Sequence, residues 1–139
     1  MGVLDELRLD GKVALVTGAS HGIGEAIALA FAEAGADVAL AARTLADLER
    51  VAAQIVARGR RALVVPTDVR DRTAVDLMVH RTVAGLGGLD ILANVAGINR
   101  RKPIFEVTLD DWDAVVEVNL RAVYFGSQAA ARLMRERGG

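Results

Sequence analysis

The sequence predicts one α/β domain built on a doubly wound parallel sheet. Four short apolar runs, of the kind that form strands buried on both faces, alternate with four longer amphipathic runs typical of helices. Glycine, aspartate and threonine mark most of the joins between these runs. Because the chain has 139 residues, it has room for one hydrophobic core, and we expect a single domain over residues 1–139.

The strands are predicted from short runs of valine, leucine, isoleucine and alanine that are bounded by glycine or polar residues. Such continuous apolar runs are typical of parallel strands that are covered by helices on both sides. The expected strands, in chain order, are residues 12–17, 37–42, 61–66 and 89–93.

The helices are predicted from apolar positions at helical spacing and from their end signals. Thr44 with Asp47, and Thr108 with Asp111, stand three residues apart, as in capping boxes at the starts of the second and fourth helices. A paired-carboxylate catalytic reading of Asp110 and Asp111 is weaker than their fit to the positive end of that fourth helix. The expected helices are residues 22–34, 45–58, 73–84 and 109–137, and glycines follow the first three at positions 35, 59 and 85.

Composition and charge exclude several classes of function. The net charge is −1, with 17 basic and 18 acidic residues, so we expect no nucleic-acid partner. The absence of cysteine excludes disulfides and thiolate sites, and with two histidines, His21 and His80, we expect no metal site. No apolar run approaches the ~20 residues that cross a bilayer. We therefore expect a cytoplasmic protein with no membrane partner.

A glycine-rich segment joins the first predicted strand to the first predicted helix. It reads Gly-x-x-x-Gly-x-Gly at Gly18, Gly22 and Gly24, which differs from the common Gly-x-Gly-x-x-Gly spacing. Small residues let the chain turn sharply and bring backbone N–H groups, at the positive end of the helix, close to a diphosphate. A tight turn without a ligand is the alternative reading. Between a strand and a helix, the segment predicts a Rossmann-type nucleotide site.

With this loop and three further elements, the sequence resembles the classical short-chain dehydrogenase/reductase family over its whole length. Asp68-Val69 resembles the pair that touches the adenine in that family, residues 94–97 (Asn-Val-Ala-Gly) resemble its Asn-Asn-Ala-Gly element, and Asn119 resembles its helical asparagine. Val95 departs from the family, which usually has a second asparagine there. The resemblance implies hydride transfer between a nicotinamide cofactor and a carbonyl or alcohol substrate. The implied cofactor-binding residues are Gly18, Ser20, His21, Gly22, Ile23, Gly24, Arg43, Thr44, Asp68, Val69, Asn94, Ala96 and Gly97.

The end of the second predicted strand bears on the choice of cofactor. In Rossmann-type folds an acidic residue about 20 residues past the glycines binds the ribose 2′-hydroxyl of NAD, whereas an arginine accommodates the 2′-phosphate of NADP. Here Ala42 is followed by Arg43 and Thr44, which can bind a phosphate. His21 stands where NADP-using relatives often carry a basic residue. We expect NADP, with NAD as the alternative; a solvated arginine and a ligand-free loop histidine are the simpler readings.

The resemblance also implies a catalytic serine, tyrosine and lysine, the last two spaced Tyr-x-x-x-Lys, and the sequence lacks this spacing. Its one tyrosine, Tyr124, is followed four residues later by Gln128. Asn119 is the member of the catalytic set that is present: in relatives it kinks the helix and holds a water in the proton relay, although a solvent-facing asparagine is the alternative. We expect the amino-terminal half of a longer enzyme, truncated after the fourth β-α unit and inactive alone. A non-catalytic dinucleotide sensor or partner subunit is the other hypothesis.

Residues 96–103 and the last helix bear on substrates and partners. The loop resembles that of gluconate-5-dehydrogenase-like relatives, and Arg100, Arg101 and Lys102 would suit a sugar acid. A 3-oxoacyl group is the competing anion, and a solvated loop is the third reading. Apolar residues cover more of the last helix than one stripe requires, and in relatives this helix packs into a dimer interface. We expect a homo-dimer or homo-tetramer through that helix, and a small-molecule carbonyl or alcohol substrate.

Overall fold

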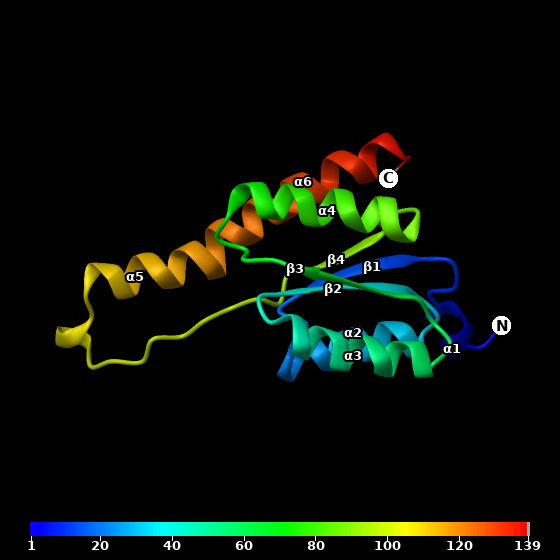
Figure 1. Cartoon of the computed structure of the whole chain (residues 1–139), viewed down its shortest axis with the longest axis horizontal. Coiled ribbons are helices and arrows are strands. Elements are labelled where there is room, and N and C mark those ends of the chain that lie inside the picture. The colour runs from blue at the N-terminus through cyan, green and yellow to red at the C-terminus, as the bar shows by residue number, and fades with distance from the viewer. Residues whose placement is uncertain (139) are drawn as a thin grey trace.

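The computed structural model describes residues 1–138 and has one four-stranded sheet between two layers of helices (Figure 1). The strands are β1 (Val13–Thr17), β2 (Asp37–Ala42), β3 (Ala62–Pro66) and β4 (Ile91–Ala93). Neighbouring strands all pair in parallel, in the order β3-β2-β1-β4. The predicted Rossmann-type doubly wound α/β fold is confirmed.

Helices cover both faces of this sheet (Figure 1). One face carries α2 (Gly22–Glu33) and α3 (Leu45–Ala57), and the other carries α4 (Arg72–Leu86) and α6 (Ala122–Glu136). A short helix that the sequence did not predict, α1 (Val3–Glu6), precedes β1. The predicted helix over residues 109–137 forms as a continuous run of α5 (Leu109–Val116), a π-helical turn η2 (Glu117–Arg121) and α6.

The two inner strands, β1 and β2, separate two apolar cores. Leu15 and Ala39 belong to the core beneath α4 and α6, whereas the next residues along each strand, Val16 and Leu40, belong to the core beneath α2 and α3. All four are fully buried. Successive side chains of a strand point to opposite faces, so a strand covered on both sides must be apolar at every position. This is the reason why the strands were recognisable as continuous apolar runs.

Two predicted helix-end signals are wrong. Gly85 lies inside α4, where it packs against the Leu63 side chain, and the helix ends instead at Gly87, which has a left-handed φ of 86°. Thr44 precedes α3 but makes no capping hydrogen bond, so the expected capping box with Asp47 does not form. The Thr44 hydroxyl is therefore not engaged by the helix that follows it.

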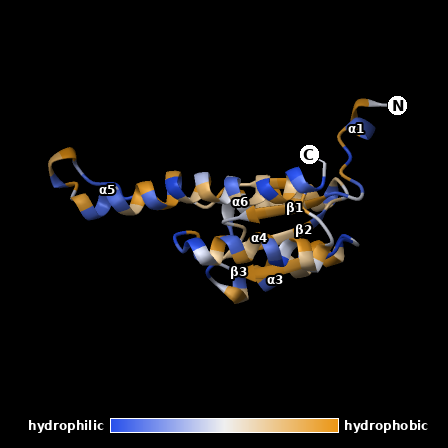
Figure 2. Cartoon of the chain, turned by 90° about the horizontal axis from the view of Figure 1, so that it is seen from above, coloured by the Kyte–Doolittle hydropathy of each residue, from blue (hydrophilic) through white to orange (hydrophobic). Residues whose placement is uncertain are grey.

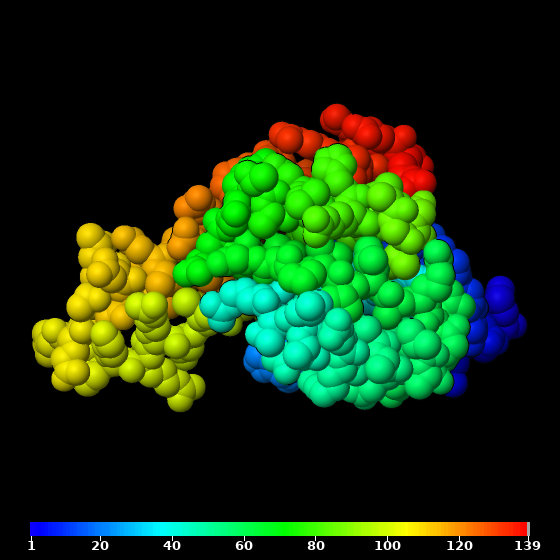
Figure 3. Space-filling view, in the orientation of Figure 1, coloured from blue at the N-terminus to red at the C-terminus, as the bar shows by residue number. Residues whose placement is uncertain are grey.

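Residues 98–121, which we call the arm, extend away from the sheet (Figures 1 and 3). The arm contains a 3-10 turn, η1 (Ile104–Glu106), followed by α5 and η2. Apolar and polar residues alternate along α5 (Figure 2). Much of the apolar surface of the arm is uncovered, and Phe105 is 98% exposed. Its other exposed large apolar residues are Ile104, Val107, Leu109, Trp112 and Leu120. In the part of the chain that the structure describes, no helix is both long enough and apolar enough to span a membrane.

Candidate functional site

The residues singled out from the sequence converge at the carboxyl ends of the strands. Residues 18–24 follow β1, Arg43 and Thr44 follow β2, Asp68 and Val69 follow β3, and residues 94–97 follow β4. From β3 the chain crosses to the far side of β1 to form β4, so the winding direction reverses at β1. Open α/β sheets bind ligands in the crevice at such a switch point. The topology places this crevice between the loops that follow β1 and β4.

The glycine loop, residues 18–24, is packed tightly on one side and open on the other. A Cβ on Gly24 would lie 2.0 Å from the Gly18 carbonyl oxygen, and a Cβ on Gly18 would lie 2.8 Å from the Ala96 Cα. Gly22 has a left-handed φ of 56°, but a Cβ there would meet nothing within 4 Å. The loop therefore needs small residues where it contacts itself and the segment after β4. At Gly22, where α2 begins, a side chain would extend into open space.

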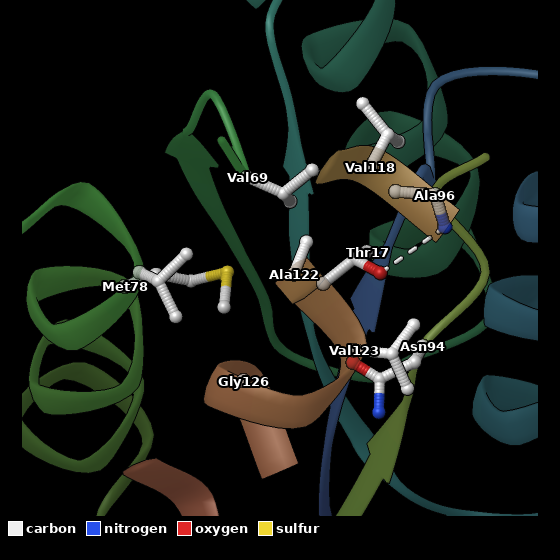
Figure 4. A pocket seen from close by; sticks show the side chains of 10 residues that line it. Thr17, Val69, Met78, Asn94, Ala96, Val118, Ala122, Val123 and Gly126 are labelled. Atoms are coloured by element: carbon white, nitrogen blue, oxygen red, sulfur yellow. Dashed lines mark hydrogen bonds between the residues drawn. The ribbon is translucent and has the colours of Figure 1, made fainter. Parts of the chain in front are cut away.

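Thr17, the last residue of β1, connects the two loops of the crevice. Its buried hydroxyl accepts hydrogen bonds from the N–H groups of Ala96 (3.2 Å; Figure 4) and Val95 (3.1 Å) and donates to the Ala93 carbonyl at 3.4 Å. Thr17 was not among the residues predicted from the sequence, although its position directly before the glycine loop was an available signal. A small cavity beneath the crevice is lined by residues that include Thr17, Val69, Asn94, Ala96, Val118 and Gly126 (Figure 4).

Ser20 and His21 join their side chains inside the glycine loop. The Ser20 Oγ lies 2.9 Å from the His21 Nδ1, and Ser20 is buried whereas His21 is exposed. Ile23 is also exposed, in the first turn of α2. The buried serine thus holds the imidazole at the surface of the loop.

The ends of β2 and β3 form a corner with a positive balance of charge. Arg43 and Thr44 are both exposed there. The nearby Asp68 is bound by Arg70, whose Nη2 donates to the Asp68 Oδ2 at 2.6 Å. Hydrogen bonds from Arg70 are the main cause that lowers the pKa of Asp68, and the positive charge of Arg43 lowers it further. Because Arg70 already pairs with the carboxylate, Asp68 does not cancel the charge of Arg43.

Asn94 is oriented by α6, which lies across the end of β4. Its Nδ2 donates to the Ser127 Oγ at 3.1 Å, and a Cβ on Gly126 would stand 3.2 Å from its Oδ1. The sequence analysis assigned no role to either α6 residue. They contact Asn94 because the crossover connection brings α6 back over the sheet.

Asn119 lies in the π-helical turn and binds the segment that follows Gly97. Its Oδ1 accepts from the Ile98 N–H at 2.8 Å, and its Nδ2 donates to the Ile98 carbonyl at 2.9 Å. This pair of bonds imitates strand pairing and fastens the start of the arm to the helix. The role of Asn119 in holding a water stays a prediction.

The Asp111 carboxylate binds the loop at Arg100 and Lys102 to the start of α5. This carboxylate, 5% exposed, accepts from Lys102 Nζ at 2.6 Å, Arg100 Nη1 at 3.3 Å, and both the N–H (3.0 Å) and Oγ1 (2.8 Å) of Thr108. The Asp111 N–H in turn donates to the Thr108 Oγ1 at 3.2 Å, so the predicted capping box forms. The bond from Lys102, followed by those from Thr108, holds the pKa of Asp111 well below its ordinary value. Of the three loop cations, Arg101 alone forms no ion pair within residues 1–138.

The ion pairs and hydrogen bonds of the Asp111 carboxylate predict how the arm responds to acid. Because the folded-state pKa of Asp111 is depressed, its stabilising effect is complete above the unfolded value of about 3.9 and is lost as the pH falls below it. We expect the fluorescence anisotropy of Trp112, the only tryptophan, to be constant between about pH 8 and 5 and to fall below about pH 4 as the arm loosens. Asp111→Asn should lower the anisotropy already at neutral pH. Asp110→Asn, with the same change of charge one residue away, is the control and should leave it unchanged.

The described residues bring together no tyrosine and lysine that could exchange a proton. Tyr124 is exposed on α6, its ring edge-to-face with Phe125 at a centroid distance of 5.3 Å. Lys12 precedes β1 at the opposite end of the sheet, and Lys102 is bound by Asp111. Within residues 1–138 no three His, Cys, Asp or Glu side chains lie close enough to share a metal ion. Within residues 1–138 the crevice therefore brings together backbone N–H groups, hydroxyls and amides, but no tyrosine–lysine pair.

Comparison with known proteins agrees with this arrangement. The family model described as short chain dehydrogenase matches residues 12–139. Gluconate 5-dehydrogenase of Gluconobacter oxydans is 42% identical over 134 residues, which are 96% of this chain and 52% of the relative. This chain spans about half the length of the curated relatives it matches.

Solved structures show the same fold. A short chain dehydrogenase from Burkholderia cenocepacia in complex with NADP is 50% identical with a TM-score of 0.87, covering 91% of this chain and 52% of that one. A 7α-hydroxysteroid dehydrogenase complexed with NADH and a 7-oxo bile acid is 34% identical with a TM-score of 0.94, covering 100% of this chain and 54% of that one. The sheet described above thus corresponds to about half of each of these structures.

Proposed function

Because this chain belongs to the short-chain dehydrogenase family, we propose that residues 1–139 are the dinucleotide-binding domain of an NADP(H)-dependent oxidoreductase that acts on a small carbonyl or alcohol substrate. The observation that carries the proposal is the glycine loop. Its packed side accepts no Cβ at Gly18 or Gly24, while Gly22 opens onto free space at the start of α2. The start of a helix carries a partial positive charge and N–H groups without partners in the helix, and both fit a diphosphate.

Different residues around the crevice would bind different parts of the cofactor. The glycine loop, with Ser20, His21 and Ile23, would bind the diphosphate, and Asp68 and Val69 would flank the adenine. Asn94, Ala96 and Gly97 would lie along the nicotinamide-side ribose. The bound nicotinamide would supply or accept the hydride, and this chain's own residues would bind and orient it. Asn119 would act on the catalytic side by holding the segment after β4 in place through Ile98.

The preference for NADP(H) is supported by the charge at the end of β2. Arg43 and Thr44, the two residues directly after β2, are exposed, neither carries a carboxylate, and Arg70 pairs with Asp68. A guanidinium can bind a phosphate through two parallel hydrogen bonds. Solved relatives are described with NADP or with NADH, so NAD is the alternative cofactor.

The proposed substrate class is a sugar acid or another small anionic carbonyl or alcohol compound. The similarity to a gluconate 5-dehydrogenase supports the sugar acid over a 3-oxoacyl group. Arg100 and Lys102 already pair with Asp111, so we do not propose these two loop cations for binding the substrate. Arg101 is the cation of this loop that we propose for an anionic substrate.

A second copy of the chain is the proposed partner for the apolar surface of the arm and α6. Trp112, Leu120 and Tyr124 are each more than 60% exposed. Large apolar patches of this kind on a soluble domain mark interaction sites. The proposed assembly is a homo-dimer or homo-tetramer.

Expression of residues 1–139 alone tests whether this chain binds the cofactor without catalysing turnover. We expect this chain to bind NADP(H), because its loops hold the phosphate and adenine contacts, and to catalyse no turnover, because no lysine stands four residues after Tyr124. Calorimetric titration measures the binding, and nicotinamide absorbance over a panel of sugar acids and ketones measures turnover. A family member with an intact Tyr-x-x-x-Lys is the positive control. Measurable turnover by residues 1–139 would mean that the active site has been misplaced.

The alternative function is a non-catalytic dinucleotide sensor or a partner subunit. It is favoured by the same lack of a Tyr-x-x-x-Lys spacing. Sequencing the transcript beyond the codon for Gly139 separates the two. A downstream serine followed by Tyr-x-x-x-Lys supports the oxidoreductase, whereas an immediate stop codon supports the sensor.

A further inference from the structure

We propose that Arg50, on α3, is a positioning residue for dinucleotide binding: it anchors the Ser20 carbonyl and thereby aims the His21 N–H at the diphosphate. The inference rests on the proposed function of the glycine loop. Arg50 lies outside that loop, and neither its position in α3 nor any motif of the sequence pointed to it.

The contacts of Arg50 join the loop to two helices. Its Nη2 donates to the Ser20 carbonyl at 2.9 Å and to the Glu25 Oε2 at 2.9 Å, and its Nη1 donates to the Glu25 Oε1 at 2.8 Å. Gln54, one turn further along α3, donates to the same carboxylate at 3.3 Å. The bonds from Arg50 are the main cause that lowers the pKa of Glu25 to about 2. Glu25 is therefore ionised at neutral pH and holds the guanidinium in a fixed orientation beside the loop.

The bond to the Ser20 carbonyl sets the direction of one particular N–H group. In a trans peptide the carbonyl oxygen and the following N–H point in opposite directions, and the described residues contain no cis peptide. Because Arg50 draws the Ser20 oxygen toward α3, the His21 N–H points away from α3. His21 precedes Gly22, where a Cβ would meet nothing within 4 Å, and it has extended dihedrals with φ −163°. Among residues 1–138 this N–H donates no hydrogen bond, and it belongs to the part of the loop proposed to bind the diphosphate.

Other anchors leave this peptide unsupported. The Ala19 N–H donates to the Ala41 carbonyl at 3.3 Å, which fixes the loop before Ser20, and the Glu25 N–H donates to the His21 carbonyl at 3.3 Å, which fixes it afterwards. The peptide between Ser20 and His21 lies between these two anchors. Compensating changes in the Ser20 ψ and His21 φ angles would rotate this peptide plane and turn the N–H away. The Arg50 guanidinium prevents that rotation.

Arg58 supplies a matched control on the same pair of helices. It directly follows the last residue of α3 and donates to a carboxylate of α2, with its Nε 3.0 Å from the Glu33 Oε1, but it donates to no residue of the glycine loop. Arg58→Ala therefore removes an ion pair between α2 and α3 without freeing a loop peptide. A role of Arg50 limited to joining the helices would make the two alanine variants equivalent.

The test measures dissociation constants of NADP⁺ and NAD⁺ for the full chain by calorimetry, and the free energy of unfolding of each variant. We expect Arg50→Ala to weaken both cofactors alike, by about tenfold, because they share the diphosphate, and Arg58→Ala to change neither by more than about twofold. Arg50→Lys keeps the positive charge but loses the guanidinium that donates to two acceptors at once. We expect its loss of cofactor affinity to lie between the losses of the two alanine variants. This variant keeps the test decisive if Arg50→Ala does not fold.

Each other outcome overturns a different claim. Unchanged binding by both Arg50 variants, or equal weakening by Arg50→Ala and Arg58→Ala, overturns the positioning role and leaves the proposed function intact. Weakening of NADP⁺ alone would mean that Arg50 binds the 2′-phosphate instead. A wild-type chain that binds neither cofactor overturns the proposed function and, with it, this inference.

Discussion

Gly24→Ala is expected to abolish dinucleotide binding and to destabilise the fold by about 3 kcal/mol, the upper part of the range for overpacking a tightly packed interior. The new methyl group would stand 2.0 Å from the Gly18 carbonyl oxygen, so either the first turn of α2 or the glycine loop must move. The neighbouring atom belongs to the backbone and cannot rotate away as a flexible side chain would. Moving the loop would also separate Gly18 from Ala96 and disturb both sides of the crevice. Chemical denaturation and calorimetric titration with NADP⁺ measure the two effects.

Two other glycines serve as controls for this substitution. Gly22 and Gly59 both have left-handed φ, 56° and 76°, and a Cβ at either would meet nothing within 4 Å. Alanine at either position should cost about 1–2 kcal/mol of stability through backbone strain alone. Gly22→Ala should also weaken the dinucleotide, whereas Gly59→Ala, beyond the end of α3, should leave its affinity unchanged. Wild-type affinity in Gly24→Ala would contradict a diphosphate site in the glycine loop.

Arg43→Ala should convert a preference for NADP(H) into indifference between the two cofactors. The loss of a charge-assisted hydrogen bond to the 2′-phosphate costs about 1.5–3 kcal/mol, which corresponds to about 10- to 100-fold weaker NADP(H) binding. NAD(H) carries no 2′-phosphate, so its affinity should stay within about twofold of the wild type. Because Arg43 is exposed, the free energy of unfolding should change little.

Arg81→Ala is a suitable control for Arg43→Ala. Arg81 is also exposed, but it lies on α4, which covers the other face of the sheet from α2 and α3. The substitution Arg81→Ala removes the same charge far from the proposed site and should alter the affinity for neither cofactor. Equal losses of NADP(H) and NAD(H) affinity in Arg43→Ala would refute the assignment of the 2′-phosphate to this residue. A wild-type preference for NAD(H) would refute it as well.

The sequence alone determined the order of strands and helices, the parallel sheet and the position of the glycine loop. The signals for these features lie in neighbouring residues: a strand buried on both faces is a continuous apolar run such as residues 13–16, and the three loop glycines stand together in one short segment. The capping box of Thr108 and Asp111 was predictable for the same reason, since its two members stand three residues apart. The expected capping box at Thr44 failed, because a local pattern permits a hydrogen bond without requiring it.

The tertiary structure alone decided which side chains hold these local elements in place. Thr17 binds a residue 79 positions away, Asn94 binds Ser127 from the returning α6, and Arg50 reaches the Ser20 carbonyl across 30 positions. The Asp111 carboxylate accepts hydrogen bonds from Lys102 and Arg100 because the arm folds back on itself. Hydrogen bonds between distant residues depend on how whole helices and strands pack, and no pattern of neighbouring residues encodes the distance between two such groups.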